Sequence, residues 1–265
     1  MACMLLLVLF MIRTAIILAA GRGSRLDPGG TVSDFSKPLM VVAGESLLSR
    51  TVDACRQAGA NRILIVTGFR AELVRREILR LDRGDLREVY NPDWQRSNGL
   101  SLLACRPVVD EDFALMMSDH VFDTSILADL MARPVPAGSV VLAVDRQIDS
   151  VFDLADATKV VIRDERIVEI SKQLDDYNAV DCGLFACSPA IFEALAAVRD
   201  ERGDCSLSDG MRQIGEAGRF LAFDIGARWW QDVDTPDMLE QASRLLDGQP
   251  PRDPAIGAAP RVTVQ

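Results

Sequence analysis

Short apolar runs rich in β-branched residues recur along the chain and alternate with segments of helical spacing. Residues 13–19 (RTAIILA), 62–67 (RILIVT) and 139–144 (SVVLAV) are such runs, and an unbroken run of this length is typical of a strand buried on both faces. Helical periodicity marks residues 47–58 and 71–81. The alternation predicts an α/β fold with a Rossmann-like, mixed but mostly parallel sheet and helices on both faces.

The rest of the chain continues this alternation with one interruption. Residues 158–162 and 166–170 alternate with a period of two around Arg163, Asp164 and Glu165, which predicts a hairpin and hence a small antiparallel insertion. We predict further strands at 86–90, 112–117, 181–187 and 219–225, and helices at 100–106, 124–131, 189–198, 206–217 and 236–246. No linker interrupts residues 13–246, so one domain is predicted there.

The two ends of the chain differ from this domain in composition. Residues 1–12 (MACMLLLVLFMI) form an apolar N-terminal extension that is shorter than the ~20 residues needed to cross a bilayer. The extension has no basic start and no cleavage site of small residues, so it does not resemble a signal peptide. A start at Met11 and a weak membrane anchor are the alternatives. Residues 247–265, rich in Pro, Gly and Ala, predict a disordered tail.

Charge and cysteine usage exclude several classes of function. The net charge of −10 argues against nucleic acid or anionic lipid as the partner, and no stable membrane anchor is expected. The six cysteines contain no CxxC pair and the only histidine is His120, so a zinc site is not supported. We therefore expect reduced thiols in a cytoplasmic protein. The oligomeric state stays open between a monomer and a homodimer.

A glycine-rich loop directly follows the first predicted strand. Its sequence, LAAGRGSRL over residues 18–26, lets backbone N–H groups approach phosphate oxygens closely. The third glycine of a GxGxxG dinucleotide fingerprint is missing, and no GxxxxGK[ST] P-loop is present. The alternatives at this point are a phosphate-binding loop and an ordinary surface loop.

Several motifs together resemble those of the sugar-1-phosphate nucleotidyltransferases. They are LAAGRGSRL, SKPL ending at Leu39, SNGLSLL from Ser97, MSDH ending at His120, VDCGLF from Val180 and WQDVDT ending at Thr235. Within that superfamily the chain looks most like CTP:inositol-1-phosphate cytidylyltransferases, and phosphocholine cytidylyltransferases are also similar. The resemblance implies the nucleotide-diphospho-sugar transferase type of fold.

The resemblance also implies which residues bind the nucleotide. The loop is expected to cradle the phosphates, with Arg25 at the reacting centre and Arg22 on the β- and γ-phosphates. The turn at 97–101 is expected to read the base, where cytosine would fit but other bases would too; a plain helix N-cap is the alternative. The expected nucleotide-binding residues are Leu18, Ala19, Ala20, Gly21, Arg22, Gly23, Ser24, Ser97, Asn98, Gly99 and Ser101.

Lysine usage points to residues with special roles. The chain has only three lysines, at positions 37, 159 and 172, among 29 basic residues. The lysine ammonium is a compact point charge, whereas the arginine guanidinium is planar. In a chain that otherwise uses arginine, a lysine can therefore indicate a position that needs the compact ammonium group. By the resemblance, Lys37 contacts the phosphates at the reacting centre and Lys172 contacts the phosphate of the second substrate. Lys159 receives no role.

Two aspartates at strand ends are the predicted metal ligands. Asp119 follows a predicted strand, where the carboxyl ends of parallel strands line a ligand crevice, and Mg²⁺ prefers a few carboxylate oxygens completed by phosphate and water. The resemblance assigns this metal to Asp119 and Asp232, with Asp234 as an outer ligand. Helix N-caps are the alternative role for Asp119 and Asp232.

On the acceptor side, the resemblance assigns substrate contacts to Asp181, Gly183 and Lys172. Cys182 stands where the family usually has threonine, so a hydroxyl contact is not expected there. His120 is expected to be a structural neighbour of Asp119 and not a base, because a phosphate nucleophile is already ionised.

The resulting prediction is a Mg²⁺-dependent nucleotidyltransferase. The phosphate of a small phosphorylated alcohol, inositol-1-phosphate by preference, attacks the α-phosphorus of an NTP, by preference CTP, and pyrophosphate leaves. Phosphocholine, a hexose-1-phosphate and molybdopterin are alternative acceptors. A nucleotide sensor that does not catalyse and, more remotely, a dinucleotide oxidoreductase are the competing classes.

Overall fold

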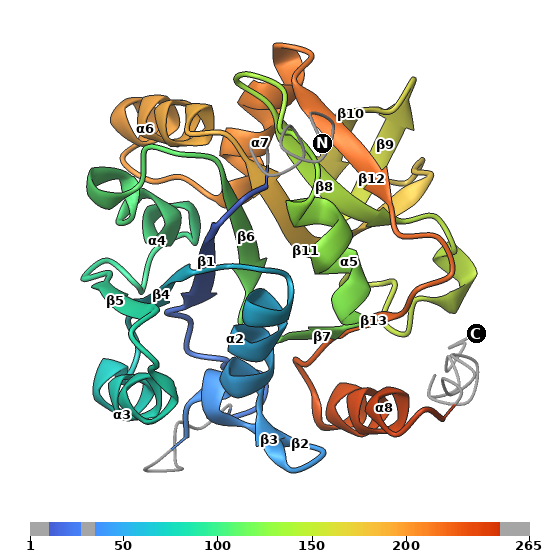
Figure 1. Cartoon of the computed structure of the whole chain (residues 1–265). Helices are drawn as coiled ribbons and strands as arrows, with labels where there is room; N and C mark the ends of the chain where they lie inside the picture. The colour runs from blue at the N-terminus through green and yellow to red at the C-terminus, as the bar shows by residue number, and fades with distance from the viewer. Residues whose placement is uncertain (1–10, 28–34, 250–265) are drawn as a thin grey trace, which may run out of the picture.

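A mixed nine-stranded sheet forms the centre of the computed structural model, which describes residues 11–27 and 35–249 (Figure 1). The strands lie in the order β5-β4-β1-β6-β11-β8-β12-β10-β9, and β9 also pairs with β11. Their bounds are β1 Thr14–Ala19, β4 Arg62–Thr67, β5 Leu86–Tyr90, β6 Phe113–Met117, β8 Val140–Asp145, β9 Lys159–Arg163, β10 Arg166–Ser171, β11 Ala179–Cys187 and β12 Phe220–Asp224.

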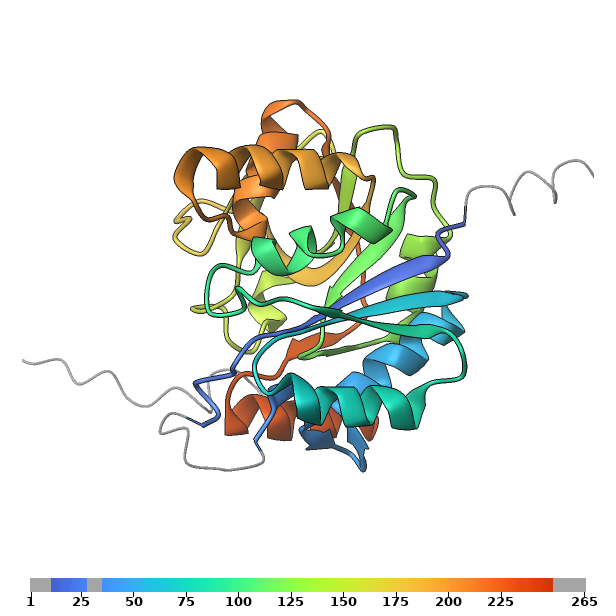
Figure 2. The ribbon, with the colours of Figure 1, turned by 90° about the vertical axis from the view of Figure 1, so that its left-hand side faces the viewer.

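Helices cover both faces of this sheet, as Figure 2 shows. One face carries α2, α3 and α5, and the other carries α4, α6 and α7, while α8 lies beside α2 (Figure 1). The helices are α2 Leu47–Gln57, α3 Ala71–Leu81, α4 Gly99–Leu103, α5 Thr124–Met131, α6 Ala190–Arg202, α7 Leu207–Glu216 and α8 Pro236–Leu246. The predicted mixed α/β fold with helices on both faces is confirmed.

The two layers of helix explain why the strand sequences are unbroken apolar runs. In β1, Ile16 and Leu18 pack into the core beneath α4, α6 and α7. Ile17 and Ala19 point to the opposite face and pack with α2, α3 and α5. Because successive side chains alternate between faces, a strand covered on both sides must be apolar at every position.

Strand direction changes at β11. The pairs β4–β5, β1–β4, β1–β6 and β8–β12 are parallel, whereas β11 runs antiparallel to β6 and β8. The predicted hairpin is β9–β10, which is antiparallel. Its turn residues Asp164 and Glu165 have φ of 48° and 61°, the left-handed values that a tight hairpin turn requires at both central positions.

Two small two-stranded sheets were missed by the sequence analysis. One joins β2 (Val41–Val42) to β3 (Glu45–Ser46), and the other joins β7 (His120–Phe122) to β13 (Trp230–Asp232). Strands of two or three residues are too short to show periodicity. The β7–β13 pair matters for the site, because its register places Asp232 opposite His120.

The ends of the predicted domain can be followed only in part. Ile12, assigned to the N-terminal extension, is 3% exposed in the core, and its N–H donates to Met131 O at 3.0 Å. Residues 1–10 of the extension and the predicted tail from 250 onward lie outside the described residues. Within the part of the chain that is described, no helix is both long and apolar enough to cross a membrane.

Stacked phenylalanines link the sheet to α6 and lead to a prediction of stability. The rings of Phe113 and Phe192 lie 5.3 Å apart at 22°, and both side chains are nearly inaccessible. We expect Phe192→Ala to lower the free energy of unfolding by about 3–5 kcal/mol, because it removes buried area and leaves a cavity. Urea unfolding measures this, with Val168→Ala at an exposed position as the control. A loss below about 1 kcal/mol would contradict this packing.

Candidate active site

The site lies where β1 and β6 end side by side. The two strands are parallel, with Leu18 paired to Met117, and Ser118 N donates to Leu18 O at 3.1 Å. The glycine-rich loop leaves β1 at the same edge at which Asp119 leaves β6. Ligands of open α/β sheets bind at the carboxyl ends of the strands, because the segments that follow two neighbouring strands turn away from each other there and leave a crevice.

A first cavity of about 340 Å³ opens at this edge. Its walls come from the glycine-rich loop, the turn before α4 and the ends of β1 and β6. The lining residues are Leu18, Ala20, Gly21, Gly23, Ser24, Arg25, Lys37, Pro38, Trp94, Arg96, Asn98, Ser101, Met117, Ser118, Asp119 and Asp234. Most of the residues predicted to bind nucleotide therefore surround one cavity.

Gly23 and Lys37 fit against each other in this wall. Gly23 has φ of 67°, and a Cβ built there would lie 2.8 Å from Lys37 Cβ. A side chain at position 23 would thus strain the backbone and displace the lysine stem. The short helix η1 (Lys37–Leu39), with Pro38 in its first turn, holds Lys37 so that its side chain is only 9% exposed.

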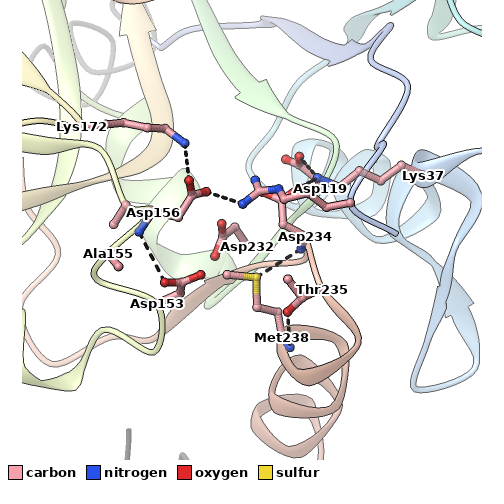
Figure 3. A network of polar contacts seen from close by, with 12 residues as sticks. Lys37, Asp119, Asp153, Ala155, Asp156, Lys172, Asp232, Asp234, Thr235 and Met238 are labelled. Atoms are coloured by element: carbon pink, nitrogen blue, oxygen red, sulfur yellow. Dashed lines mark hydrogen bonds and ion pairs between the residues drawn. The ribbon is translucent and has the colours of Figure 1, made fainter. Parts of the chain in front are cut away.

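A chain of alternating charges runs through the site (Figure 3). The Lys37 ammonium pairs with both Asp119 and Asp234. Arg25 pairs with Asp234 through Nη2 and with Asp156 through Nη1. Lys172 Nζ lies 3.1 Å from Asp156 Oδ1. Residues far apart in sequence are thus joined, with three cations alternating with carboxylates.

Burial and charge act in opposite directions on the groups of this network. Burial alone would lower the pKa of Lys37, but Asp119 and Asp234 raise it above the ordinary lysine value. Burial would raise the pKa of Asp119, but Lys37 and His120 hold it well below its usual range. Lys37 and Asp119 are therefore both charged at neutral pH, the condition for electrostatic work on a phosphate.

Asp232 is in a different electrostatic position. Its pKa is raised, first by burial and also by the nearby Asp234 and Asp119, while His120 and Lys37 act in the opposite direction. Its Oδ1 accepts a hydrogen bond from Gln231 Nε2 at 3.2 Å. A buried carboxylate surrounded by other carboxylates is a place where additional positive charge would be stabilising.

The carboxylates fit a hard divalent cation. Within the described ranges, no group of three or more His, Cys, Asp or Glu side chains forms a ready-made metal site. Mg²⁺ does not need such a cage, because it is usually held by one or two carboxylates together with substrate phosphates and water. The donor set of Asp119 and Asp232, with Asp234 nearby, therefore suits Mg²⁺ bound together with a nucleotide.

A second cavity of about 180 Å³ adjoins the first and shares Asn98, Met117 and Asp234 with it. Its walls come from β11, the start of α7, the hairpin and β13. The other lining residues are His120, Asp156, Ala157, Thr158, Ile170, Lys172, Asp181, Gly183, Phe185, Leu207, Ser208, Met211, Trp230 and Asp232. All three residues predicted to contact the acceptor, Lys172, Asp181 and Gly183, are among them.

Gly183 shapes this second cavity. It lies at an irregularity in β11, with φ of 72°, and a Cβ there would lie 2.6 Å from His120 Nε2. Its N–H donates to Asp181 Oδ1 at 2.7 Å. Burial raises the pKa of Asp181 to about 6, although this hydrogen bond acts against the shift. The site therefore holds a carboxylate that is costly to ionise.

His120 contacts its neighbours as its expected structural role requires. Its Nδ1 lies 2.7 Å from Asp119 Oδ1, and its ring stacks on Trp230 with centroids 5.9 Å apart. Burial would lower the pKa of His120, but Asp119 and Asp232 raise it. The imidazole thus contacts Asp119 Oδ1, the carboxylate oxygen that does not pair with Lys37.

Four of the residues predicted to bind nucleotide line neither cavity. Ser97 Oγ donates to Asp204 at 2.9 Å, and a Cβ on Gly99 would lie 2.5 Å from a backbone carbonyl oxygen. Ala19 is 2% exposed in the core. The Arg22 guanidinium lies 5.9 Å from the centre of the Phe69 ring. In the structure these four residues therefore make packing contacts or local hydrogen bonds and do not face either cavity.

Two of the predicted base-reading side chains do reach the first cavity, and each is held in place. Asn98 Oδ1 accepts from Leu207 N at 2.9 Å, and Ser101 Oγ accepts from Asn91 Nδ2 at 2.9 Å. The Asn98 amide nitrogen and the Ser101 hydroxyl hydrogen are the polar groups that this turn offers to a ligand.

Several residues of the site were not predicted from the sequence. Asp156 lies in a loop without periodicity, and Trp94 and Arg96 gave no pattern that separates them from core or surface residues. Trp230 belongs to the WQDVDT motif but was assigned no role. Asp234 was placed only in an outer position, whereas it pairs directly with Lys37 and Arg25. Its place in the WQDVDT motif was the available signal.

The fold and site define a nucleotide-handling α/β protein of the nucleotide-diphospho-sugar transferase type. The chain belongs to the family of MobA-like NTP transferase domains, whose sequence profile matches residues 15–216. The resemblance to sugar-1-phosphate nucleotidyltransferases is thereby confirmed.

Individual relatives are similar over most of the chain. The bifunctional IPC transferase and DIPP synthase of Thermococcus kodakarensis is 33% identical over 233 residues, 88% of this chain and 50% of the relative. The Rubrobacter xylanophilus protein of the same description is 37% identical over 238 residues, 88% of this chain and 52% of the relative. The chain thus spans about half the length of these curated relatives.

A solved structure is similar over nearly its whole length. It is described as the inositol-1-phosphate CTP transferase from T. maritima, and it is 26% identical to this chain with a TM-score of 0.75. The match covers 91% of this chain and 98% of the other.

The raised pKa of Asp181 leads to a prediction with a defined sign. A carboxyl whose pKa is about 6 in the folded state binds more protons there than in the unfolded chain, where its pKa is about 4. Its ionisation therefore lowers stability progressively from about pH 4, and the full cost is present above pH 6. Asp181→Asn keeps the acceptor oxygen for Gly183 N and removes the charge. We expect the variant to unfold at a higher temperature at pH 7.5, because its free energy of unfolding is higher by about 1–3 kcal/mol.

Thermal unfolding between pH 5 and pH 8 measures this difference. The advantage of Asp181→Asn should shrink as pH falls through 6, where the wild-type carboxyl takes up its proton. Asp175→Asn, in the exposed loop before β11, is the control. An equal effect of Asp181→Asn at pH 5 and pH 8 would show that ionisation is not the cause.

Proposed function

We propose that the protein is a Mg²⁺-dependent cytidylyltransferase that joins CTP to inositol-1-phosphate in the cytoplasm and releases pyrophosphate. The observation that carries the proposal is the meeting of two cavities at Asp234, with Lys37 and Arg25 in the wall of the first cavity and Lys172 in the second. This arrangement suits a reaction between two phosphorylated molecules. The buried free cysteines at 55, 105, 182, 187 and 205 are consistent with a reducing compartment.

In the proposed reaction, the phosphate oxygen of the acceptor attacks the α-phosphorus of the nucleotide. The bond between the α-phosphorus and the bridging oxygen breaks, and pyrophosphate leaves with the electron pair. Lys37 and Arg25 neutralise charge at the reacting phosphate, while N–H groups of the glycine-rich loop hold the triphosphate. Lys172 holds the acceptor phosphate. No side chain has to remove a proton, since the attacking phosphate is already ionised.

Asp119 and Asp232 are the proposed ligands of Mg²⁺, with Asp234 as an outer ligand that orients Lys37 and Arg25. The metal would supply neutralisation of phosphate charge and alignment of the nucleotide. The protein's own contribution is to hold these carboxylates at the junction of the cavities. His120 keeps Asp119 in one orientation through its Nδ1 contact.

Support for CTP and inositol-1-phosphate comes from the relatives. The T. maritima structure carries that activity in its description and matches this chain over nearly its whole length. In the bifunctional relatives, the match to this chain covers about half of the relative's length. The second cavity supports a small polar acceptor, because Asp181, Thr158 and Ser208 can bind hydroxyl groups.

A screen for pyrophosphate release tests this proposal. Each of the four NTPs is combined with inositol-1-phosphate, phosphocholine, a hexose-1-phosphate and molybdopterin, with Mg²⁺ present. We expect the highest kcat/KM for CTP with inositol-1-phosphate, and loss of release when EDTA removes the metal. NTP binding with no release for any acceptor would instead identify a nucleotide sensor.

Lys37 provides the sharpest mutational test. Lys37→Met keeps the length of the stem and removes the charge that faces the reacting phosphate. We expect kcat to fall by about 10²–10³, corresponding to about 3–4 kcal/mol of transition-state stabilisation. Arg106→Gln removes a positive charge at an exposed ion pair with Glu193 and should keep wild-type kcat.

Turnover has to be compared between folded proteins, because Asp119 and Asp234 lose their shared cation in Lys37→Met. Cooperative unfolding of the variant by circular dichroism provides this check. Wild-type turnover by folded Lys37→Met would refute the role of Lys37.

A further inference from the structure

Asp156 lies between the two halves of the site and has no role in the reaction proposed above. It belongs to the loop between β8 and β9, and it lines the second cavity beside Lys172 and Asp232. Its side chain is 34% exposed. Figure 3 shows this side chain between Lys172 and the part of the network formed by Asp234 and Lys37.

The two carboxylate oxygens of Asp156 contact cations from opposite halves of the site. Oδ2 lies 2.5 Å from Arg25 Nη1, and Oδ1 lies 3.1 Å from Lys172 Nζ. Burial would raise the pKa of Asp156, but Arg25 and Lys172 lower it, so the group is ionised at neutral pH. One anion thus bridges a cation assigned to the nucleotide and the cation assigned to the acceptor.

A carboxylate in this position resembles one edge of a phosphate. An acceptor phosphate that reacts with the α-phosphate must lie between the cation of its own half-site and those of the nucleotide half-site. The bridging position of Asp156 between Lys172 and Arg25 meets that description. Two anions cannot share it without strong repulsion, because like charges a few ångströms apart in a part-buried site are destabilising.

Every cation that lines the cavities, within the described ranges, already has an acceptor in the structure. Lys37 pairs with Asp119 and Asp234, Arg25 with Asp234 and Asp156, and Lys172 with Asp156. Arg96 donates to a backbone carbonyl. The carboxylates paired with Lys37, Arg25 and Lys172 are Asp119, Asp234 and Asp156. Asp119 and Asp234 belong to the proposed metal centre, whereas Asp156 has no role there.

The backbone around Asp156 is held by hydrogen bonds, while its side chain is only partly buried. Lys159, 7% exposed, donates through Nζ to Ala157 O at 3.2 Å and to Lys172 O at 3.0 Å. Asp156 N donates to Asp153 O at 3.2 Å. The loop is therefore tied to the strand end that carries Lys172.

We propose that Asp156 is an internal anion that occupies the position of the acceptor's phosphate in the free protein and is displaced by that phosphate. This inference rests on the function proposed above. Asp156 keeps Arg25 and Lys172 ordered before the acceptor arrives. It also selects against small anions, because inorganic phosphate must break two ion pairs without the binding energy of the rest of an acceptor molecule.

A simple positioning role for Asp156 makes the opposite prediction. If Asp156 only orients Arg25 and Lys172 toward the substrates, its neutralisation loosens both cations and weakens the binding of anions. If Asp156 competes for the position, its neutralisation strengthens their binding. The sign of the change in affinity therefore separates the two roles.

The test is a calorimetric titration of inorganic phosphate into the full chain. We expect Asp156→Asn to bind phosphate about threefold to tenfold more tightly than wild type, as expected for two part-exposed ion pairs. Asp153→Asn is the matched control, because it removes one negative charge from the same loop. Asp153 Oδ1 accepts from Asp156 N at 3.3 Å, and the asparagine oxygen can keep this contact, so the variant should bind phosphate as wild type does. Adding Lys172→Met to Asp156→Asn should abolish the gain.

Equal or weaker phosphate binding by Asp156→Asn, or an equal gain in Asp153→Asn, would overturn the inference. This titration needs no turnover, so it gives a result even if the screen finds no substrate and the proposed function fails. If the screen does find the acceptor, its KM should fall in Asp156→Asn by a similar factor, and inorganic phosphate should become a stronger competitive inhibitor.

Discussion

The site depends on one buried lysine held between two carboxylates. Lys37 reaches Asp119 at the end of β6 and Asp234 just after β13, two elements that would otherwise bring negative charge together. Asp232 adds a third carboxylate, and burial near the other two raises its pKa. Because buried like charges repel strongly in a medium of low dielectric, the junction requires cations. Such a junction is suited to holding a magnesium-bound triphosphate.

The arrangement of strands explains why these groups meet. Parallel pairing of β1 with β6 puts the glycine-rich loop and Asp119 at one edge of the sheet. The short β7–β13 pair then brings Asp232 and Asp234 to the same edge from the C-terminal part of the chain. The antiparallel β11 carries Asp181 and Gly183 toward the second cavity. Parts of the chain that are far apart in sequence therefore supply one site. They are the ends of β1 and β6, the segment at the end of β13, and the irregular part of β11.

The sequence predicted the bounds of several elements correctly. The bounds predicted for β4 and β5 and for α3, α5 and α8 agree with the structure, because long apolar or amphipathic runs carry their own periodicity. The helix predicted at 100–106 is instead α4 followed by a separate 3₁₀ turn at Arg106–Val108, since Pro107 cannot continue an α-helix. In the site, the lysine of the KPL motif and the aspartate after β6 were recognised, whereas Asp156 was not.

By itself the sequence determined the α/β class, the order of most strands and helices along the chain, and the position of the glycine-rich loop after the first strand. These properties depend on local periodicity and backbone freedom, which a linear pattern carries. Only the tertiary structure decided which cation pairs with which carboxylate. Lys37 and Asp234 are 197 positions apart, and Arg25 and Asp156 are 131 apart. Electrostatic attraction depends on distance through space and on burial, and neither can be read from separation along a chain.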